Sequence, residues 1–331
     1  MIDQNNLPYD IIRCTTHDEW LNARRSGIGS SEAGTLGCVN TFDTPIKLWK
    51  RKTGEALPEK ESKYMTAGHE FEPAVAFMFA QKTGSIIDSD SVGDWIAVDR
   101  NKPHLRVSPD RLFYLKDTPE EDRVWSKAYL LECKTTSKAI DPDDVPLYWF
   151  YQVQYQMRVL GIRRAVIAWI SSHGGLSFGF TEVAYDPAFM ADLEERIDTF
   201  WTENVMGGKC PEWVMDSEDA VVRWKTAELD ADGNPRYVVA DDRTLGLIAE
   251  YGELFPKYKE MEERIDAIKL AAQCYMGKAG RLIGPEDTLL ATWTNSTSAG
   301  RFDVKRFAAD NPELYARYVG APSTTRRFLF K

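Results

Sequence analysis

The chain has 331 residues, 43% of them hydrophobic, and a formal net charge of −10 at pH 7. This length allows one large core, or one domain with an accessory part. The negative charge argues against a simple basic nucleic-acid binder, but not against an enzyme with a local basic groove, because binding depends on the field at the site. No apolar run is long enough to cross a bilayer, and "MIDQNNLPYD" lacks the pattern of a signal peptide, so neither feature is expected.

The five cysteines are scattered along the chain and form no C-x-x-C pair. We therefore expect no disulfide framework, zinc ribbon or iron–sulfur cluster, and a reducing cytoplasm is the expected location. The four histidines show no metal-ligand spacing, so they are expected to be structural or exposed.

The first part of the chain is typical of helices. A loop and a helix are predicted over 15–38, where Ser30 or Ser31 is the candidate N-cap. The segment "TPIKLWKRKTGE" (44–55) has a proline suited to the first turn of a helix and a glycine suited to its end. In "YMTAGHEFEPAVAFMFAQKTG" (64–84), apolar residues recur at helical spacing.

Short segments rich in β-branched and aromatic residues follow, and these indicate strands. They are "SIIDSD", "DWIAVD", "LRVSPDRLFYL", "KAYLLECKTT", "RRAVIAWISS" and "GFTEVAYD". Further helices are predicted over 145–161 and 187–205. The sequence therefore predicts an α/β (α+β) fold in which helices flank a central mixed sheet.

The composition changes after residue 212, so we expect a core over 1–212 and a C-terminal extension over 213–331. From Leu247 to Tyr275, apolar and aromatic residues are spaced by alternating fours and threes, which indicates a long helix (about 243–282) that packs on another helix. It is expected to pack on the core as part of a helical hairpin; the alternative is a subunit interface.

Three further features of the extension have expected structures. Pro256 lies off the apolar stripe and is expected to kink the long helix or to start a second one. The segments "LLATWTN" and "RFDV" are expected to be short strands around a small helix (303–318). The tail "TTRRFLFK" is expected to be a closing strand, with a DNA contact as the alternative.

Glu132 and Lys134 end the predicted strand "KAYLLECKTT", and residues two apart in a strand share a face. Such a triplet is usually a plain ion pair. Alternatively, the carboxylate holds a divalent cation while the lysine orients or activates a water molecule. That interpretation needs a second carboxylate, and "VSPDRL" supplies Asp110 on the preceding strand of a hairpin. Oxygen ligands favour Mg²⁺ or Mn²⁺ over zinc.

Several motifs resemble one nuclease family. "SPD…LECK" resembles the core of the PD-(D/E)xK superfamily, which has a restriction-endonuclease-like fold. "WLNARRSGIGSSEA", "GHEFEP", "SPDRL" and "QVQYQM" occur in the order typical of the YqaJ-type viral recombinases, the family of phage lambda exonuclease. The resemblance covers about residues 18–205. It implies a Mg²⁺-dependent 5′→3′ double-strand DNA exonuclease that leaves 3′ overhangs for phage-type recombination by single-strand annealing.

The resemblance also implies roles for residues around the charge pair. Asp110 and Glu132 resemble the metal ligands, together with the main-chain carbonyl of Cys133. Lys134 resembles the catalytic lysine beside the attacking water. Glu72 matches a helix glutamate that approaches the metal through water.

Four further residues match positions that contact DNA. Gln152 matches a glutamine that helps place the nucleophile or the scissile phosphate. Arg24, Ser31 and Ser108 match a pocket for the 5′ phosphate of the strand that is cut. An arginine and a serine at a helix N-terminus suit a terminal phosphate, although Ser31 as a plain helix cap and Arg25 in place of Arg24 are alternatives.

The implied cofactor is Mg²⁺, with two ions per site and Mn²⁺ as a substitute. The implied partners are double-stranded DNA ends, a single-strand annealing protein and further copies of the chain in a ring such as a trimer, with no membrane. The implied setting is the cytoplasm of a bacterial host, and the implied origin is a phage or mobile element. The alternatives are another PD-(D/E)xK endonuclease or a non-catalytic protein that binds DNA ends.

Overall fold

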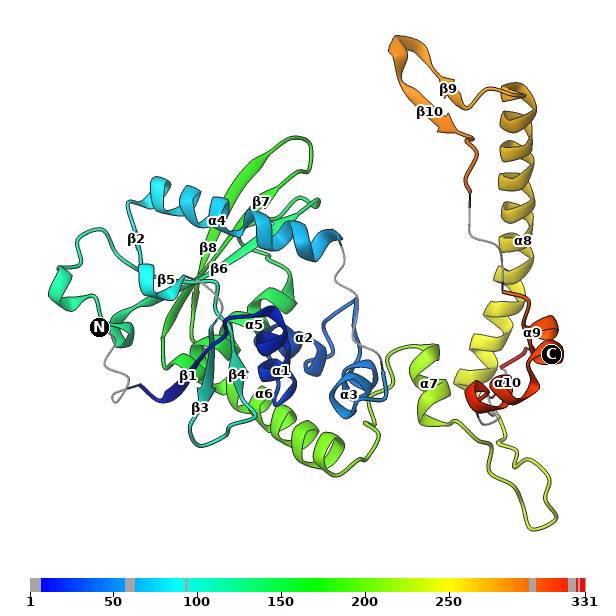
Figure 1. Ribbon diagram of the computed structural model, residues 1–331, viewed down its shortest axis with the longest axis horizontal. Coiled ribbons are helices and arrows are strands. Elements are labelled where there is room, and N and C mark those ends of the chain that lie inside the picture. The colour runs from blue at the N-terminus through cyan, green and yellow to red at the C-terminus, as the bar shows by residue number, and fades with distance from the viewer. Residues whose placement is uncertain are drawn as a thin grey trace. The chain divides into compact units, whose positions relative to one another are not determined.

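The computed structural model describes residues 7–56, 63–92, 95–297, 302–320, 326 and 328–330. The chain forms two compact units, Met1–Trp224 and Lys225–Lys331. Figure 1 labels their helices and strands. None of the described helices has the length and apolar character needed to cross a membrane.

The first unit begins with a strand and a series of helices. These are β1 (Tyr9–Arg13), α1 (His17–Arg25), a 3₁₀ turn (Ser30–Glu32), α2 (Ala33–Leu36), α3 (Pro45–Thr53) and α4 (Lys63–Thr83). The side chains of Thr16 and Thr44 cap α1 and α3, each by accepting a main-chain N–H three residues later. Gly54 ends α3 in the left-handed conformation, as the sequence predicted.

The prediction that Ser30 or Ser31 caps a helix was wrong. The chain makes a short 3₁₀ turn at these residues, and α2 starts only at Ala33. Gly29 precedes that turn, and its N–H donates to Glu32 Oε2 at 2.7 Å. The Ser31 hydroxyl instead accepts a hydrogen bond from Arg24. The Ser31 hydroxyl therefore does not cap a helix, and the Glu32 carboxylate binds the N–H of Gly29, which precedes the turn.

The core of this unit is a five-stranded sheet in the order β2-β5-β6-β7-β8. Its strands are β2 (Ile86–Ile87), β5 (Arg111–Tyr114), β6 (Tyr129–Thr136), β7 (Arg164–Ser171) and β8 (Ser177–Ala184). β6 and β7 are parallel and the other pairs are antiparallel. The predicted mixed sheet is thus confirmed. A smaller antiparallel sheet joins β1 to β3 (Trp95–Asp99) and β4 (Arg106–Val107).

Helices cover both faces of the large sheet (Figure 1). On one face α4 packs Val75 and Phe79 against Leu131 and Val166. On the other lie α5 (Leu147–Leu160) and α6 (Pro187–Thr199), which runs on through a π-helical turn (Phe200–Met206). Because side chains alternate along β6, Glu132 belongs to the α5 face.

The first unit ends with α7 (Ser217–Arg223). Thr44 Oγ1 donates to Asp219 Oδ1 at 2.8 Å, and both residues are buried. Lys47 Nζ donates to Asp216 Oδ2 at 2.8 Å. The sequence suggested a boundary at residue 212; these contacts explain why the compact unit continues to Trp224.

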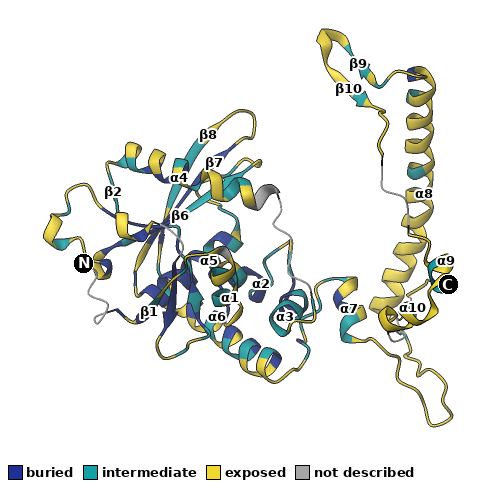
Figure 2. Ribbon diagram, viewed as in Figure 1, coloured by how far each residue is buried: buried dark blue, intermediate teal, exposed yellow. Residues whose placement is uncertain are grey.

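The second unit is built around α8 (Asp242–Met276), which is followed by a hairpin of β9 (Arg281–Ile283) and β10 (Leu289–Thr292). Pro256 lies inside α8, which continues through it as one helix. Figure 2 shows that α8 is exposed along most of its length. The exposed residues include the large members of the apolar stripe, such as Leu247, Met261 and Tyr275.

Two expectations for the end of the chain were wrong. The small helix is two helices, α9 (Val304–Asp310) and α10 (Pro312–Tyr318), which are separated by Asn311. In "RFDV", Asp303 caps α9 and Val304 begins it, so no strand forms over the described residues there. Much of "TTRRFLFK" lies outside the described residues, and its described positions 326 and 328–330 are not in a strand.

Candidate active site

Glu132 and Lys134 belong to one buried polar network on the α5 face of the sheet. Lys134 Nζ donates to Glu132 Oε1 at 2.6 Å and to Gln152 Oε1 at 2.9 Å. Gln152 Nε2 donates to Glu132 Oε1 at 2.5 Å. Glu132 is only 1% exposed, so the pair is not the solvated ion pair that an isolated E-x-K triplet usually forms.

A second glutamine of α5 completes this network. Gln156 Nε2 donates to Glu132 Oε2 at 2.9 Å, so both carboxylate oxygens accept hydrogen bonds from side chains. Gln156 lies in "QVQYQM" but was not among the predicted site residues. Its spacing of four from Gln152, which places both on one helical face, was the available signal.

Asp110 lies just before β5, at the point where the chain enters the hairpin with β6. Its Oδ2 accepts a hydrogen bond from the main-chain N–H of Cys133 at 2.7 Å. Burial raises the pKa of Asp110 well above its ordinary value, and the charges of Glu132 and Glu72 raise it further. The two predicted metal-binding carboxylates therefore lie close enough to repel each other.

Glu72 approaches this cluster from α4. Its carboxylate pairs with the Arg111 guanidinium, which also donates to the main-chain oxygen of Asp110. Burial nevertheless raises the pKa of Glu72, against the opposing effect of Arg111. The sequence analysis did not identify Arg111, whose importance depends on a partner far away in the chain.

The predicted phosphate-binding residues lie on the N-terminal segment and near β4. Arg24 Nη2 donates to Ser31 Oγ at 2.7 Å, and the Arg24 guanidinium lies 4.5 Å from the centre of the Trp20 ring. Arg25 is exposed and does not line the pocket described below. Ser108 Oγ donates to the main-chain oxygen of Trp95 at 2.9 Å.

One pocket of about 740 Å³ brings these groups together. Every predicted site residue lines it: Arg24, Ser31, Glu72, Ser108, Asp110, Glu132, Cys133, Lys134 and Gln152. Arg106 and His69, to which the sequence analysis gave no role, also line it. His69 is exposed, which agrees with its expected surface position.

The donor chemistry of the pocket fits a hard divalent cation. Asp110, Glu132 and Glu72 offer only oxygen atoms, and a cation would relieve the repulsion that raises the pKa of Asp110. Over the described ranges, no three Asp, Glu, His or Cys side chains form a ready-made metal-binding group. The two carboxylates of Asp110 and Glu132 thus fit a metal whose other ligands would be further oxygen atoms, such as those of water.

Comparisons with known proteins agree with the motifs. The family model described as "YqaJ-like viral recombinase domain" matches residues 19–163. A similar curated protein is "Uncharacterized protein YqaJ" of Bacillus subtilis (strain 168), which is 28% identical over 331 residues. That match covers 96% of this chain and 94% of the relative.

Two solved structures are similar to part of the chain. An alkaline exonuclease (LHK-Exo) from Laribacter hongkongensis is 20% identical with a TM-score of 0.44, over 58% of this chain and 93% of that one. A phage-related exonuclease from Haemophilus somnus 129PT is 11% identical with a TM-score of 0.41, over 55% of this chain and 96% of that one. The family model matches residues 19–163, which contain every predicted site residue, so the resemblance to the YqaJ-like viral recombinases that the motifs indicated is confirmed.

Proposed function

We propose that this chain is a Mg²⁺-dependent nuclease that digests one strand of linear double-stranded DNA from its 5′ end and leaves a 3′ overhang. One observation carries the proposal. The Asp110, Glu132 and Lys134 side chains line the same pocket as Arg24 and Ser31. The pocket thus combines acidic oxygen donors with a guanidinium and a hydroxyl suited to phosphate.

Asp110 and Glu132, together with the main-chain carbonyl of Cys133, would hold the Mg²⁺, with Glu72 in reach through water. When bound, the ion supplies Lewis-acid stabilisation of phosphoryl charge and lowers the pKa of a coordinated water. In this proposal Asp110 and Glu132 would be the main anionic ligands, although Glu132 also pairs with Lys134, as Glu72 pairs with Arg111.

Lys134 acts in this proposal as a charged donor. Burial alone would lower the pKa of its ammonium group, but the Glu132 and Asp110 carboxylates raise it above the ordinary value. The ammonium therefore stays protonated at neutral pH and orients the attacking water or a phosphate oxygen. Gln152 holds Lys134 and Glu132 in place through its amide.

Arg24, Ser31 and Ser108 hold the 5′ phosphate in this proposal, which sets the end from which digestion starts. The overhang then serves a single-strand annealing protein in phage-type recombination, and the enzyme works as a homo-oligomer in the bacterial cytoplasm. The family model, which describes a viral recombinase domain, supports this setting.

A digestion time course on linear duplex DNA, labelled separately at each 5′ and 3′ end, tests the proposal. With Mg²⁺, we expect early release of the 5′ label and late release of the 3′ label, with closed circular DNA left intact. Equal cutting of closed circles would instead establish an endonuclease. Binding to DNA ends without any Mg²⁺-dependent digestion would establish a non-catalytic end-binding protein.

A further inference from the structure

We propose that Arg106 is a second phosphate-binding residue of the pocket, and that the 5′ phosphate of a DNA end lies between Arg106 and Arg24. The inference rests on the proposed function, since it takes a DNA end as the ligand. It adds a residue that neither the motifs nor the family resemblance assigned.

The guanidinium of Arg106 is half-buried and its charge is not neutralised. Nε donates to the main-chain oxygen of Pro103 at 3.0 Å, and Nη1 donates to that of Ala23 at 2.7 Å. No carboxylate of the described residues forms an ion pair with it. Burial lowers the pKa of Arg106, which shows that its surroundings disfavour the charge. An anion in the pocket would offset this cost.

The other cations that line the pocket differ in their partners. Arg111 pairs with Glu72, and Lys134 pairs with Glu132. Arg24 resembles Arg106, because its Nη2 donates to the Ser31 hydroxyl and not to a carboxylate. The nearby Glu32 carboxylate is bound by Lys52 Nζ at 2.8 Å. Within the described chain, the pocket therefore presents two arginines that lack a direct carboxylate partner.

Each of these two arginines packs over a glycine of the segment "SGIGSS". A Cβ atom on Gly27 would lie closest to the main-chain oxygen of His104, and it would also lie 2.9 Å from Arg106 Cδ and 3.0 Å from its Nε. A Cβ atom on Gly29 would lie 3.2 Å from Arg24 Nη2. Between them Ile28 is fully buried, so the two glycines face the opposite side together.

In an extended chain, positions two apart are separated by about 7 Å. Each side chain packs over its own glycine, and both arginines line the same pocket. A phosphate that accepts a hydrogen bond of about 2.8 Å from each guanidinium spans a similar distance. One phosphate group can therefore contact both arginines. The two glycines in "SGIGSS" leave room for that arrangement.

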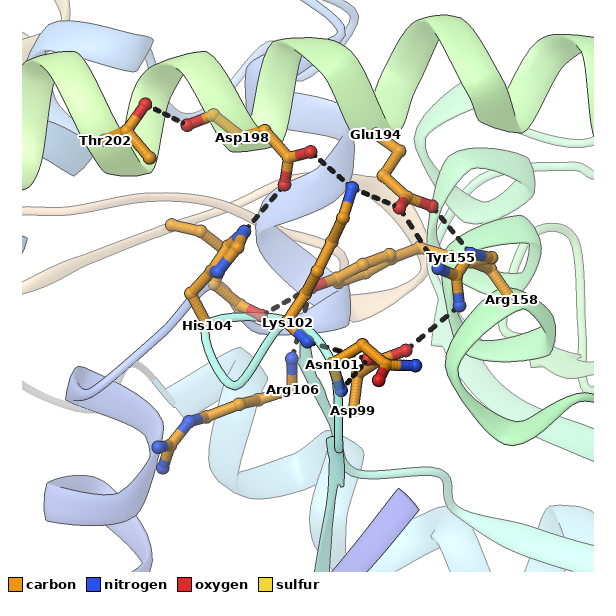
Figure 3. Close-up of polar contacts among 11 residues, drawn as sticks. Asp99, Asn101, Lys102, His104, Arg106, Tyr155, Arg158, Glu194, Asp198 and Thr202 are labelled. Carbon is orange, nitrogen blue, oxygen red and sulfur yellow. Dashed lines mark hydrogen bonds and ion pairs between the residues drawn. The ribbon is translucent and has the colours of Figure 1, made fainter. Parts of the chain in front are cut away.

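The main chain of Arg106 is fixed before any ligand binds. Its N–H donates to the Tyr155 hydroxyl at 3.2 Å, and that hydroxyl donates to the main-chain oxygen of Ile28 at 2.9 Å. Figure 3 shows the loop before Arg106 tied to α6, where Lys102 Nζ contacts Asp198 Oδ2 at 2.5 Å. A side chain that starts from a fixed loop loses less entropy when it binds an anion.

Binding of a DNA hairpin with one open end, with either a 5′ phosphate or a 5′ hydroxyl, tests the proposal. Anisotropy of the full chain is measured in EDTA, so that metal and cleavage play no part. The wild type is expected to bind the phosphorylated end more tightly. In Arg106→Gln, affinity for that end is expected to fall about tenfold or more, as for a lost charge-assisted bond, while affinity for the hydroxyl end changes less than about twofold.

Arg25→Gln is the matched control, because it removes the same charge from an exposed neighbouring position. It is expected to lower both affinities equally and only slightly. The proposal would be overturned if Arg106→Gln lowered the affinity for both DNA ends equally, or did not lower it at all. It would also be overturned if the wild type did not prefer the phosphorylated end.

If Arg106→Gln fails to fold, Arg106→Lys replaces it, since it keeps the charge but cannot reach two carbonyls and the phosphate together. A loss confined to the phosphorylated end supports the proposal, and any other result with this variant overturns it. Because the assay contains no Mg²⁺, failure here is separate from failure of the digestion experiment.

Discussion

The Lys134 ammonium is the group whose loss is expected to affect chemistry without affecting DNA binding. It contacts Glu132 and Gln152 in a buried network at one end of the pocket. We expect Lys134→Ala to lower the Mg²⁺-dependent digestion rate at least about a hundredfold, because a positioned donor is lost. Binding of DNA ends in EDTA is expected to change little. Lys138→Ala, at an exposed position close by, is the control, and this variant is expected to digest DNA at the wild-type rate. An unchanged digestion rate in the Lys134→Ala variant would refute the proposed chemistry.

The raised pKa of Asp110 predicts how the stability of the folded chain depends on pH and on Mg²⁺. Its pKa is raised on folding, so the folded state binds the proton more tightly, and stability is lost as pH rises from about 4 toward that raised pKa. Asp110→Asn removes the charge and keeps an oxygen to accept the Cys133 N–H. In EDTA at pH 7, we expect its melting temperature to exceed that of the wild type by a few degrees, about the shift for 1 kcal/mol.

Thermal unfolding with and without Mg²⁺ completes that test. Mg²⁺ is expected to raise the melting temperature of the wild type more than that of Asp110→Asn, because a ligand charge is missing in the variant. An equal Mg²⁺ effect on both proteins would exclude Asp110 as a ligand.

At this scale, the sequence located the acidic cluster but not the partners of its members. The alternation along a strand was enough to put Glu132 and Lys134 on one face, and motif order added Asp110 and Gln152. Arg111 and Arg106 could not be found in this way. Their roles depend on contacts with Glu72 and Ala23, which lie far away in the sequence and are brought near only by the fold.

Among the elements, the contact between α2 and α5 depends on glycine. A Cβ atom on Gly34 would lie 2.8 Å from Tyr148 Cβ and 3.2 Å from its Cα, so the neighbouring main chain would have to move. We expect Gly34→Ala to lower the free energy of unfolding by about 1–3 kcal/mol, the usual cost of overpacking. Urea unfolding measures the change.

Gly252→Ala in α8 is the matched control, because a Cβ atom there meets nothing within 4 Å. It is expected to stabilise its helix by about 0.5–1 kcal/mol, since alanine is the better helix former. A destabilisation of equal size in both variants would contradict the close approach of α2 and α5.

Element types were mostly predictable because helices and strands differ in apolar period, and helix ends such as Gly54 and Gly161 have local signals. The wrong predictions concern positions where a local sequence signal is compatible with two different structures. Ser30 and Ser31 resemble caps, but the glutamate at 32 bonds back to Gly29 instead. Of the two alternatives for Pro256, the start of a second helix was wrong, because α8 continues through it as one helix.

For the whole molecule, the boundary between the two units makes the sharpest prediction. The structure ends the first unit at Trp224, and the composition change suggested residue 212. The difference is α7, whose Asp219 is buried and accepts hydrogen bonds from Thr44 Oγ1 at 2.8 Å and from the main-chain N–H of Met215 at 3.0 Å. Truncation after residue 212 would leave the buried Thr44 hydroxyl without this acceptor.

We therefore expect a chain that ends at Trp224 to unfold cooperatively and to keep Mg²⁺-dependent digestion of linear DNA. A chain that ends at residue 212 is expected to lose about 1–3 kcal/mol of stability, the cost of an unsatisfied buried group, with further loss from unpacked apolar surface. Denaturant unfolding of the two truncated chains measures the difference. If the chain that ends at Trp224 aggregates while the full chain stays soluble, we infer that the exposed apolar stripe of α8 packs on the core. If the truncated chain stays folded and only its oligomeric mass falls, we infer that the stripe forms an interface between copies of the chain.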